Sequence, residues 1–136
     1  MEQLARLVNA DERLVWRGRY VHTTFLLELG DEAWLIRIEA GRIEAVTRGP
    51  FVMPAWTFAL RASRENWALF WQEAPPPGSH DLFALVKRRA LRIEGDLHPF
   101  MSNLLYFKAV LAAMRGAGDD ALRPVFAALQ GREPSP

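Results

Sequence analysis

The sequence predicts a single α/β domain of the α+β kind, residues 1–136, with five strands in a mixed, mostly antiparallel sheet and helices at both ends of the chain. The length of 136 residues suits one domain with a core of its own. Runs in which apolar and polar residues alternate end at glycine turns in the first half of the chain. Apolar residues with helical spacing dominate the second half.

The first predicted elements are a helix and three strands. One face of a helix over about residues 2–15 gathers the apolar residues Leu4, Leu7, Val8 and Leu14. The alternating runs HTTFLLEL, AWLIRIE and RIEAVT then predict strands, separated by turns at Gly30-Asp31 and Ala40-Gly41. Because the turns between these strands are short, we expect an antiparallel meander.

A crossover, a fourth strand and a helix are predicted next. The stretch GPFVMP, residues 49–54, holds two prolines and cannot pair regularly. The run AWTFALR predicts a strand over residues 55–61, and Ser63 is a candidate N-cap of a helix over about residues 64–74. Both elements present a largely aromatic face: Trp56, Phe58 and Leu60 on the strand, and Trp67, Phe70, Trp71 and Ala74 on the helix.

The predicted order closes with a short helix in DLFALVKRR, a fifth strand in ALRIEG and two further helices. A helix between the fourth and fifth strands predicts that these two strands are parallel. Pro99 suits the first position of the next helix, which carries one apolar stripe: Phe100, Leu104, Phe107, Leu111 and Met114. A last helix is predicted over about residues 119–130, and we expect residues 132–136 to be frayed.

The composition excludes several classes of function. The chain has no cysteine, which excludes disulfides and thiolate sites and favours a cytoplasmic protein. The formal net charge is +1 and basic residues lie among acidic ones, so we expect no nucleic-acid partner. We also expect no export signal and no membrane span, because no apolar stretch approaches the roughly 18 residues that a spanning helix needs.

The residues offer little for catalysis, and we expect no enzyme, no metal and no cofactor. His22, His80 and His98 have no metal-ligand spacing, and the chain has no nucleophile motif or glycine-rich phosphate loop. Asp96 and His98 are close enough in sequence to form an acid and base pair. A turn aspartate and a histidine that begins a helix explain the same two residues without chemistry. The hypothesis of a small hydrolase or isomerase depends on Asp96 and His98 acting as this acid and base pair.

Three stretches, by their order and spacing, resemble the sterol carrier protein 2 family over about residues 5–115. WLIRIEAGRIEAV is similar to that family's central hairpin, and PAWTFALRASRENWALF to the strand and Ser-capped helix that follow. ALRIEGDLHPFMSNLLYFKAVL is similar to its closing strand, Gly-Asp turn and apolar helix. At position 89 an arginine stands where the family commonly has a glycine. The resemblance implies a twisted sheet with helices over one face and an apolar tunnel for fatty acids, acyl-coenzyme A or other lipids.

The resemblance also implies which residues line the tunnel: Phe25, Trp56, Phe58, Leu60, Trp67, Phe70, Trp71, Phe83, Phe100, Leu104, Phe107, Leu111 and Phe126. An ordinary packed core would have the same residues, and the sequence leaves both interpretations open. The local basic cluster supplies three candidates for contact with a ligand headgroup, Arg88, Arg89 and Arg92, and a solvated surface is the alternative. The segment with Phe126 is either a lid over the tunnel or a docked terminal helix.

We therefore expect non-enzymatic binding or carrying of a hydrophobic ligand. The alternative is an accessory subunit that presents a lipid or an isoprenoid-quinone intermediate to a partner enzyme. We expect a monomer or a weak homodimer. The composition is also compatible with a transient contact with a membrane.

Overall fold

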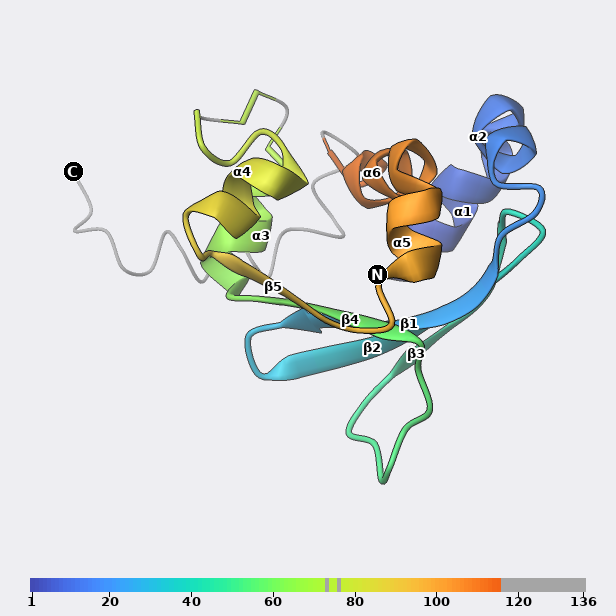
Figure 1. Ribbon diagram of the computed structural model, residues 1–136, viewed down its shortest axis with the longest axis horizontal. Helices are drawn as coiled ribbons and strands as arrows, with labels where there is room; N and C mark the ends of the chain where they lie inside the picture. Colours follow the sequence, from blue (N-terminus) through green and yellow to red (C-terminus); the bar gives the residue numbers. More distant parts are fainter. Residues whose placement is uncertain (73, 76, 116–136) are drawn as a thin grey trace.

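In the computed structural model, five strands form one sheet and the helices lie over one of its faces (Figure 1). The structure describes residues 1–72, 74–75 and 77–115. The strand order is β3-β2-β1-β4-β5, where the strands are β1 (His22–Leu29), β2 (Glu32–Glu39), β3 (Arg42–Arg48), β4 (Phe58–Ala62) and β5 (Leu91–Gly95). The α+β fold with a mixed, mostly antiparallel sheet of five strands is confirmed.

The parallel pair of the sheet is not the one predicted. β1 runs parallel to β4, with Phe25 beside Phe58, whereas β4 and β5 are antiparallel, with Ala62 opposite Leu91. The prediction assumed that the helical segment between these strands carries the chain across the sheet. The two helices, α3 (Arg64–Phe70) and α4 (Leu82–Lys87), instead return the chain to the end of the sheet where β4 finishes, so that β5 starts beside the last residue of β4. The crossover is the segment 49–57, which hangs below the sheet on the side away from the helices (Figure 1).

Two helices predicted as continuous are each broken by a capping residue. The N-terminal helix is split into α1 (Glu2–Ala10) and α2 (Glu12–Arg17) at Asp11, whose extended backbone ends α1 and whose carboxylate accepts from the Leu14 N–H at 3.1 Å. The apolar helix after β5 is split into α5 (His98–Ser102) and α6 (Leu104–Ala112) at Asn103. The Asn103 amide donates to the Pro99 carbonyl at 3.0 Å and so holds the break in place.

The remaining sequence expectations differ mainly at element ends. The third helix ends at Phe70 rather than near residue 74, and β4 begins at Phe58 rather than at residue 55. The segment 116–136, with the predicted last helix, Phe126 and the tail, lies outside the described residues. None of the helices in the described part of the chain is long and apolar enough to cross a membrane.

Candidate functional site

Four phenylalanines fill the space between the sheet and the helices α5 and α6. Phe25 and Phe58 stack from neighbouring strands with ring centres 5.2 Å apart. Phe107 meets Phe58 edge-on at 5.3 Å, and Phe100 lies 5.5 Å from Phe107. All four side chains are buried. Rings at these separations are in contact, so this part of the interlayer space is packed core.

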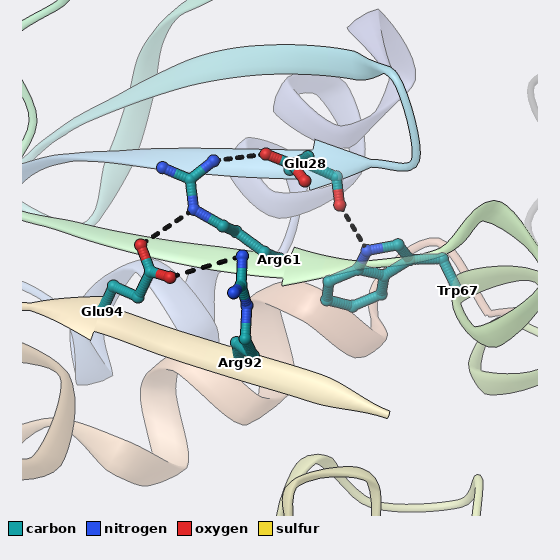
Figure 2. A network of polar contacts seen from close by, with 5 residues as sticks. All are labelled: Glu28, Arg61, Trp67, Arg92 and Glu94. Atoms are coloured by element: carbon teal, nitrogen blue, oxygen red, sulfur yellow. Dashed lines mark hydrogen bonds and ion pairs between the residues drawn. The ribbon is translucent and has the colours of Figure 1, made fainter. Parts of the chain in front are cut away.

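A second aromatic cluster, on α3, is tied to the backbone of its neighbours. Trp67 and Trp71 stack with ring centres 5.2 Å apart, and Phe70 meets Trp67 at 5.9 Å. The Trp67 indole N–H donates to the Glu28 carbonyl at 2.8 Å, as Figure 2 shows. The Trp71 indole N–H donates to the Leu111 carbonyl at 2.7 Å. These bonds fix α3 against both β1 and α6.

Beside this second cluster, a groove opens between α6 and the α3–α4 region. Its volume is about 290 Å³, just below the roughly 300–1,000 Å³ that is typical of small-molecule sites. The lining consists of Phe70, His80, Asp81, Leu82, Leu105, Lys108, Ala109, Ala112 and Arg115. Its base is apolar because it is formed by Phe70 and Leu82, which are buried core residues. The two alanines are small and leave the groove open. We call it the α6 groove.

The α6 groove carries two cations and one anion. The Lys108 Nζ lies 3.1 Å from the Asp81 Oδ1 and 4.8 Å from the centre of the Phe83 ring. Arg115 donates to the main-chain carbonyls of Phe70 and His80, both at 3.0 Å. Burial lowers the pKa of Arg115, and the nearby charge of Asp81 partly opposes this shift. With Lys108 and Arg115 at +2 and Asp81 at −1, the groove has a formal charge of +1, which favours an anionic group.

The structure brings together most of the residues expected to line a tunnel. Nine of them are buried between the sheet and the helices: Phe25, Phe58, Leu60, Trp67, Phe70, Trp71, Phe100, Phe107 and Leu111. Phe83 and Leu104 are half-buried nearer the surface. Of these eleven residues, Phe70 is the one that lines the α6 groove.

Trp56 does not join this group. Its ring lies 5.8 Å from the guanidinium carbon of Arg61. Arg61 donates to the carboxylates of Glu28 and Glu94 on the sheet face away from the helices (Figure 2). The alternation that predicted the side of Trp56 does not apply, because β4 begins only at Phe58.

The three arginines proposed for a headgroup are not brought together. Arg88 is bound within its own region, donating to the Gly78 carbonyl at 2.9 Å and to the Ser79 hydroxyl at 2.8 Å. Arg92 lies 3.4 Å from Glu94, on the same outer network as Arg61 (Figure 2). Arg89 lies in the turn after α4 with a left-handed backbone, φ +60°, the conformation that glycine adopts most easily.

Sequence reasoning missed the cations of the α6 groove. One signal was present: Lys108 interrupts the otherwise apolar run LLYFKAVLAAM. A cation within such a run has to reach solvent or an anion. Nothing local in the sequence marks Arg115, whose bonds to Phe70 and His80 cross about 45 and 35 positions of the chain.

Asp96 and His98 do not form the acid and base pair of the enzymatic hypothesis. The Asp96 carboxylate accepts from the main-chain N–H of His98 at 3.1 Å, and the His98 ring faces the Ser102 hydroxyl. Asp96 therefore acts as a turn residue that bonds the main chain just before α5, whose N-cap is Leu97. Among the described residues, no group of three His, Asp or Glu side chains is placed to hold a metal ion.

The arrangement of sheet and helices defines the fold of the sterol carrier protein 2 domain. A crystal structure of sterol carrier protein 2 matches with a TM-score of 0.70 and 12% identity, over 86% of this chain and 94% of the other. The sterol carrier protein domain 2 of Helicoverpa armigera matches with a TM-score of 0.56 and 13% identity, over 82% and 84%. The ubiquinone synthesis protein UbiJ-SCP2 matches with a TM-score of 0.54 and 13% identity, over 83% and 85%. No family model matches the sequence, and no curated protein matches it.

Proposed function

We propose that this chain is a non-enzymatic lipid-binding or lipid-carrying domain and that the alkyl chain of its ligand lies in the α6 groove. The observation that carries the proposal is an apolar groove with a net cationic rim on a sterol carrier protein 2 fold. The sterol carrier proteins among the structural neighbours support a lipid as the ligand.

The chemistry of the groove favours an acyl chain with an anionic head. Each methylene group removed from water contributes about 0.8 kcal/mol, so a partly buried acyl chain binds with few polar contacts. Lys108 and Arg115 would hold a carboxylate or a phosphate ester at the rim, and Asp81 limits the favourable charge to one negative unit. We therefore propose a fatty acid, whose carboxylate carries one negative charge, as the ligand that is carried in the cytoplasm. The aromatic residues behind Phe70 would form the back wall.

Native mass spectrometry of the purified chain, with and without added fatty acid, tests this function. We expect one lipid per chain, and we expect Ala109→Phe, which fills the α6 groove, to abolish it without unfolding the protein. Ala45→Phe, on the exposed surface of β3, is the matched control and should keep the ligand. A mass that stays free of lipid across a panel of fatty acids, or binding that Ala109→Phe leaves intact, would contradict the proposal.

The role of the cationic rim is tested with two ligands of equal chain length. We expect Lys108→Gln to weaken a fatty acid about tenfold, because a hydrogen bond between charged groups contributes about 1.5–3 kcal/mol. The corresponding fatty alcohol should bind the variant and the original protein equally. Equal weakening of both ligands would mean that Lys108 only shapes the groove.

The second candidate is an accessory subunit that presents a lipid to a partner enzyme. It is favoured by Val52 and Met53, which are 94% and 93% exposed at the tip of the segment below the sheet. A structural neighbour of the same fold is named as a ubiquinone synthesis protein, which supports a role in quinone synthesis. Substitution of both tip residues by serine should abolish co-purification with a lipid-modifying enzyme from the native host while leaving the bound lipid. Unchanged co-purification would contradict this role for the tip.

A further inference from the structure

The sheet has two edge strands, β3 and β5, and they are treated differently. At β3 the Asn9 side chain on α1 bonds to the main chain of Ile43. Its amide oxygen accepts from the Ile43 N–H at 2.8 Å, and its amide nitrogen donates to the Ile43 carbonyl at 3.0 Å. Asn9 thus takes the place of a further strand, which is one way in which proteins block a sheet edge. Within the described ranges, β5 has no such cover.

The hydrogen bonds of the sheet determine which main-chain groups of β5 point outward. The Ala62 carbonyl accepts from the Gly30 N–H at 2.9 Å, so Ala62 directs its main chain toward β1. Because main-chain groups alternate in direction along a strand, Arg61 directs its own toward β5, where it pairs with Arg92. The next residue, Ile93, therefore points its N–H and C=O away from β4. No described residue outside the sheet bonds to either group.

The charges around Ile93 are complementary to those of a second copy of the same strand. Arg89 and Arg92 precede Ile93, whereas Glu94 and Asp96 follow it. In an antiparallel pair of two β5 strands centred on Ile93, Arg92 of each copy lies opposite Glu94 of the other. The same register pairs the outward N–H and C=O of Ile93 with those of its counterpart. A parallel pair would instead place like charges side by side, which is unfavourable.

The chain by itself leaves the charge of Arg92 poorly compensated. Arg92 lies directly opposite Arg61 on β4, and like charges at opposed positions destabilise a sheet. The carboxylate of Glu94 is shared, since it accepts from Arg61 at 3.0 Å and lies 3.4 Å from Arg92 (Figure 2). The Arg92 side chain is 70% exposed. A second carboxylate on the free side of β5 would complete this network.

We propose that β5 pairs antiparallel with β5 of a second copy of this chain, about a two-fold axis through Ile93. We call this contact the β5 interface. It would join the two five-stranded sheets into one continuous sheet. Ile93 lies opposite the buried Leu60 and is half-buried on the face toward the helices, where it would contact its counterpart across the axis. One strand of five residues from each copy makes a small contact, so we expect a weak, reversible dimer.

The β5 interface is separate from the proposed lipid site. None of the residues that line the α6 groove belongs to β5. The dimer is therefore independent of the function proposed for that groove, and the two are tested by different variants.

Sedimentation velocity of the full chain over a range of concentrations measures the association. We expect a monomer–dimer equilibrium. Arg92→Glu should weaken it about tenfold or more, because the two-fold axis places the introduced carboxylate opposite the partner's Glu94 at two positions. The monomer should stay folded, since the introduced carboxylate faces Arg61. Arg37→Glu, the same change at an exposed position on β2, is the matched control and should keep the dimer.

Complementary charge reversals test the register. Glu94→Arg alone should also weaken self-association, because it places arginines opposite each other across the axis. An equimolar mixture of Arg92→Glu and Glu94→Arg should form a heterodimer, in which both contacts again join opposite charges. Circular dichroism establishes that each variant is folded.

A single thiol tests the position of the axis. The chain has no cysteine, so Ile93→Cys places one thiol from each copy at the two-fold. Residues of a hydrogen-bonded antiparallel pair have Cα atoms about 5.5 Å apart, within the range that a disulfide spans. We expect the variant to become a covalent dimer on mild oxidation. Ala45→Cys, on the exposed surface of β3, is the control and should remain uncrosslinked.

Three outcomes would overturn the proposal: a monomer at every concentration, a dimer that Arg92→Glu leaves unchanged, or a mixture of the two charge variants that stays monomeric. Loss of the dimer on substitution of Val52 and Met53 by serine would also overturn it, because the contact would then lie at the tip below the sheet. Ala109→Phe, which tests the proposed lipid site, should lose the lipid and keep the dimer.

Discussion

The two faces of α6 have opposite surroundings although both are made largely of apolar residues. The face toward the sheet buries Tyr106, Phe107, Val110 and Leu111. The other face carries Leu105, Lys108, Ala109 and Ala112, which line the α6 groove. In an ordinary surface helix the outward face would be polar. An apolar outward face that the described chain leaves open points to a ligand or a surface that covers it.

The sharpest test of this difference is to truncate one large side chain on each face. We expect Phe107→Ala to lower the free energy of unfolding by about 3–5 kcal/mol, because it removes a ring that contacts Phe25, Phe58 and Phe100. Leu105→Ala, on the exposed outward face, should change it by less than about 0.5 kcal/mol. Urea denaturation of both variants measures the two values.

Equal destabilisation by the two substitutions would contradict the difference between the two faces of α6. Equal losses would mean that Leu105 is covered in solution, by another part of the chain or by another molecule. A loss below about 1 kcal/mol for Phe107→Ala would show that the aromatic layer collapses to fill the cavity, and that it is looser than its ring contacts indicate.

Most of the fold could be predicted because its signals are local. Glycine turns with alternating runs on either side located the meander, and Ser63 marked the start of α3, where its hydroxyl accepts from the Asn66 N–H at 3.1 Å. The pairing of β5 could not be read in this way. The pairing depends on whether the helical segment between β4 and β5 crosses the sheet. In the structure α3 and α4 return the chain to the end of β4, and they are held there by tertiary contacts such as the Trp67 bond to Glu28.

The buried part of the candidate site was predictable, and the open part was not. Hydrophobic periodicity identifies residues that face a core, so Phe58, Trp71 and Phe107 were found. The groove is assembled from three helices, and its cations act through tertiary contacts: Lys108 with Asp81, and Arg115 with the carbonyl of Phe70. Proximity in sequence suggested a basic cluster at 88–92, but neighbouring residues in the chain point to different sides of a turn and a strand.

A smaller loss of stability is expected where a hydrogen bond, rather than side-chain packing, holds the inner face of α6. The Leu111 carbonyl lies in the last turn of α6 and accepts from the Trp71 indole N–H at 2.7 Å. Trp71→Phe keeps an aromatic ring but removes the donor, which leaves a buried carbonyl unsatisfied. We expect the free energy of unfolding to fall by about 1–3 kcal/mol in urea denaturation. A change of only a few tenths would mean that water replaces the indole, and that the inner face is less dry than its burial indicates.

The smallest effect on the inner face at neutral pH concerns Tyr106, which is buried and donates to the Gly41 carbonyl at 2.7 Å. Tyr106→Phe should lower the free energy of unfolding by about 1 kcal/mol, the usual net contribution of one hydrogen bond. Its more specific consequence appears at alkaline pH. Burial raises the pKa of the Tyr106 phenol well above its ordinary value.

Because the folded state keeps this phenol protonated, its contribution is complete below the unfolded pKa of about 10 and is lost as pH rises toward the folded pKa. The unfolded chain then releases a proton that the folded chain retains, so the free energy of unfolding should fall by up to about 1.4 kcal/mol per pH unit above pH 10. Tyr106→Phe should remove this part of the slope. Tyr20, the other tyrosine of the chain, is 80% exposed, so Tyr20→Phe should keep this slope. Parallel alkaline slopes in the two variants would mean that the Tyr106 hydroxyl reaches water, and that the inner face of α6 opens as readily as the outer one.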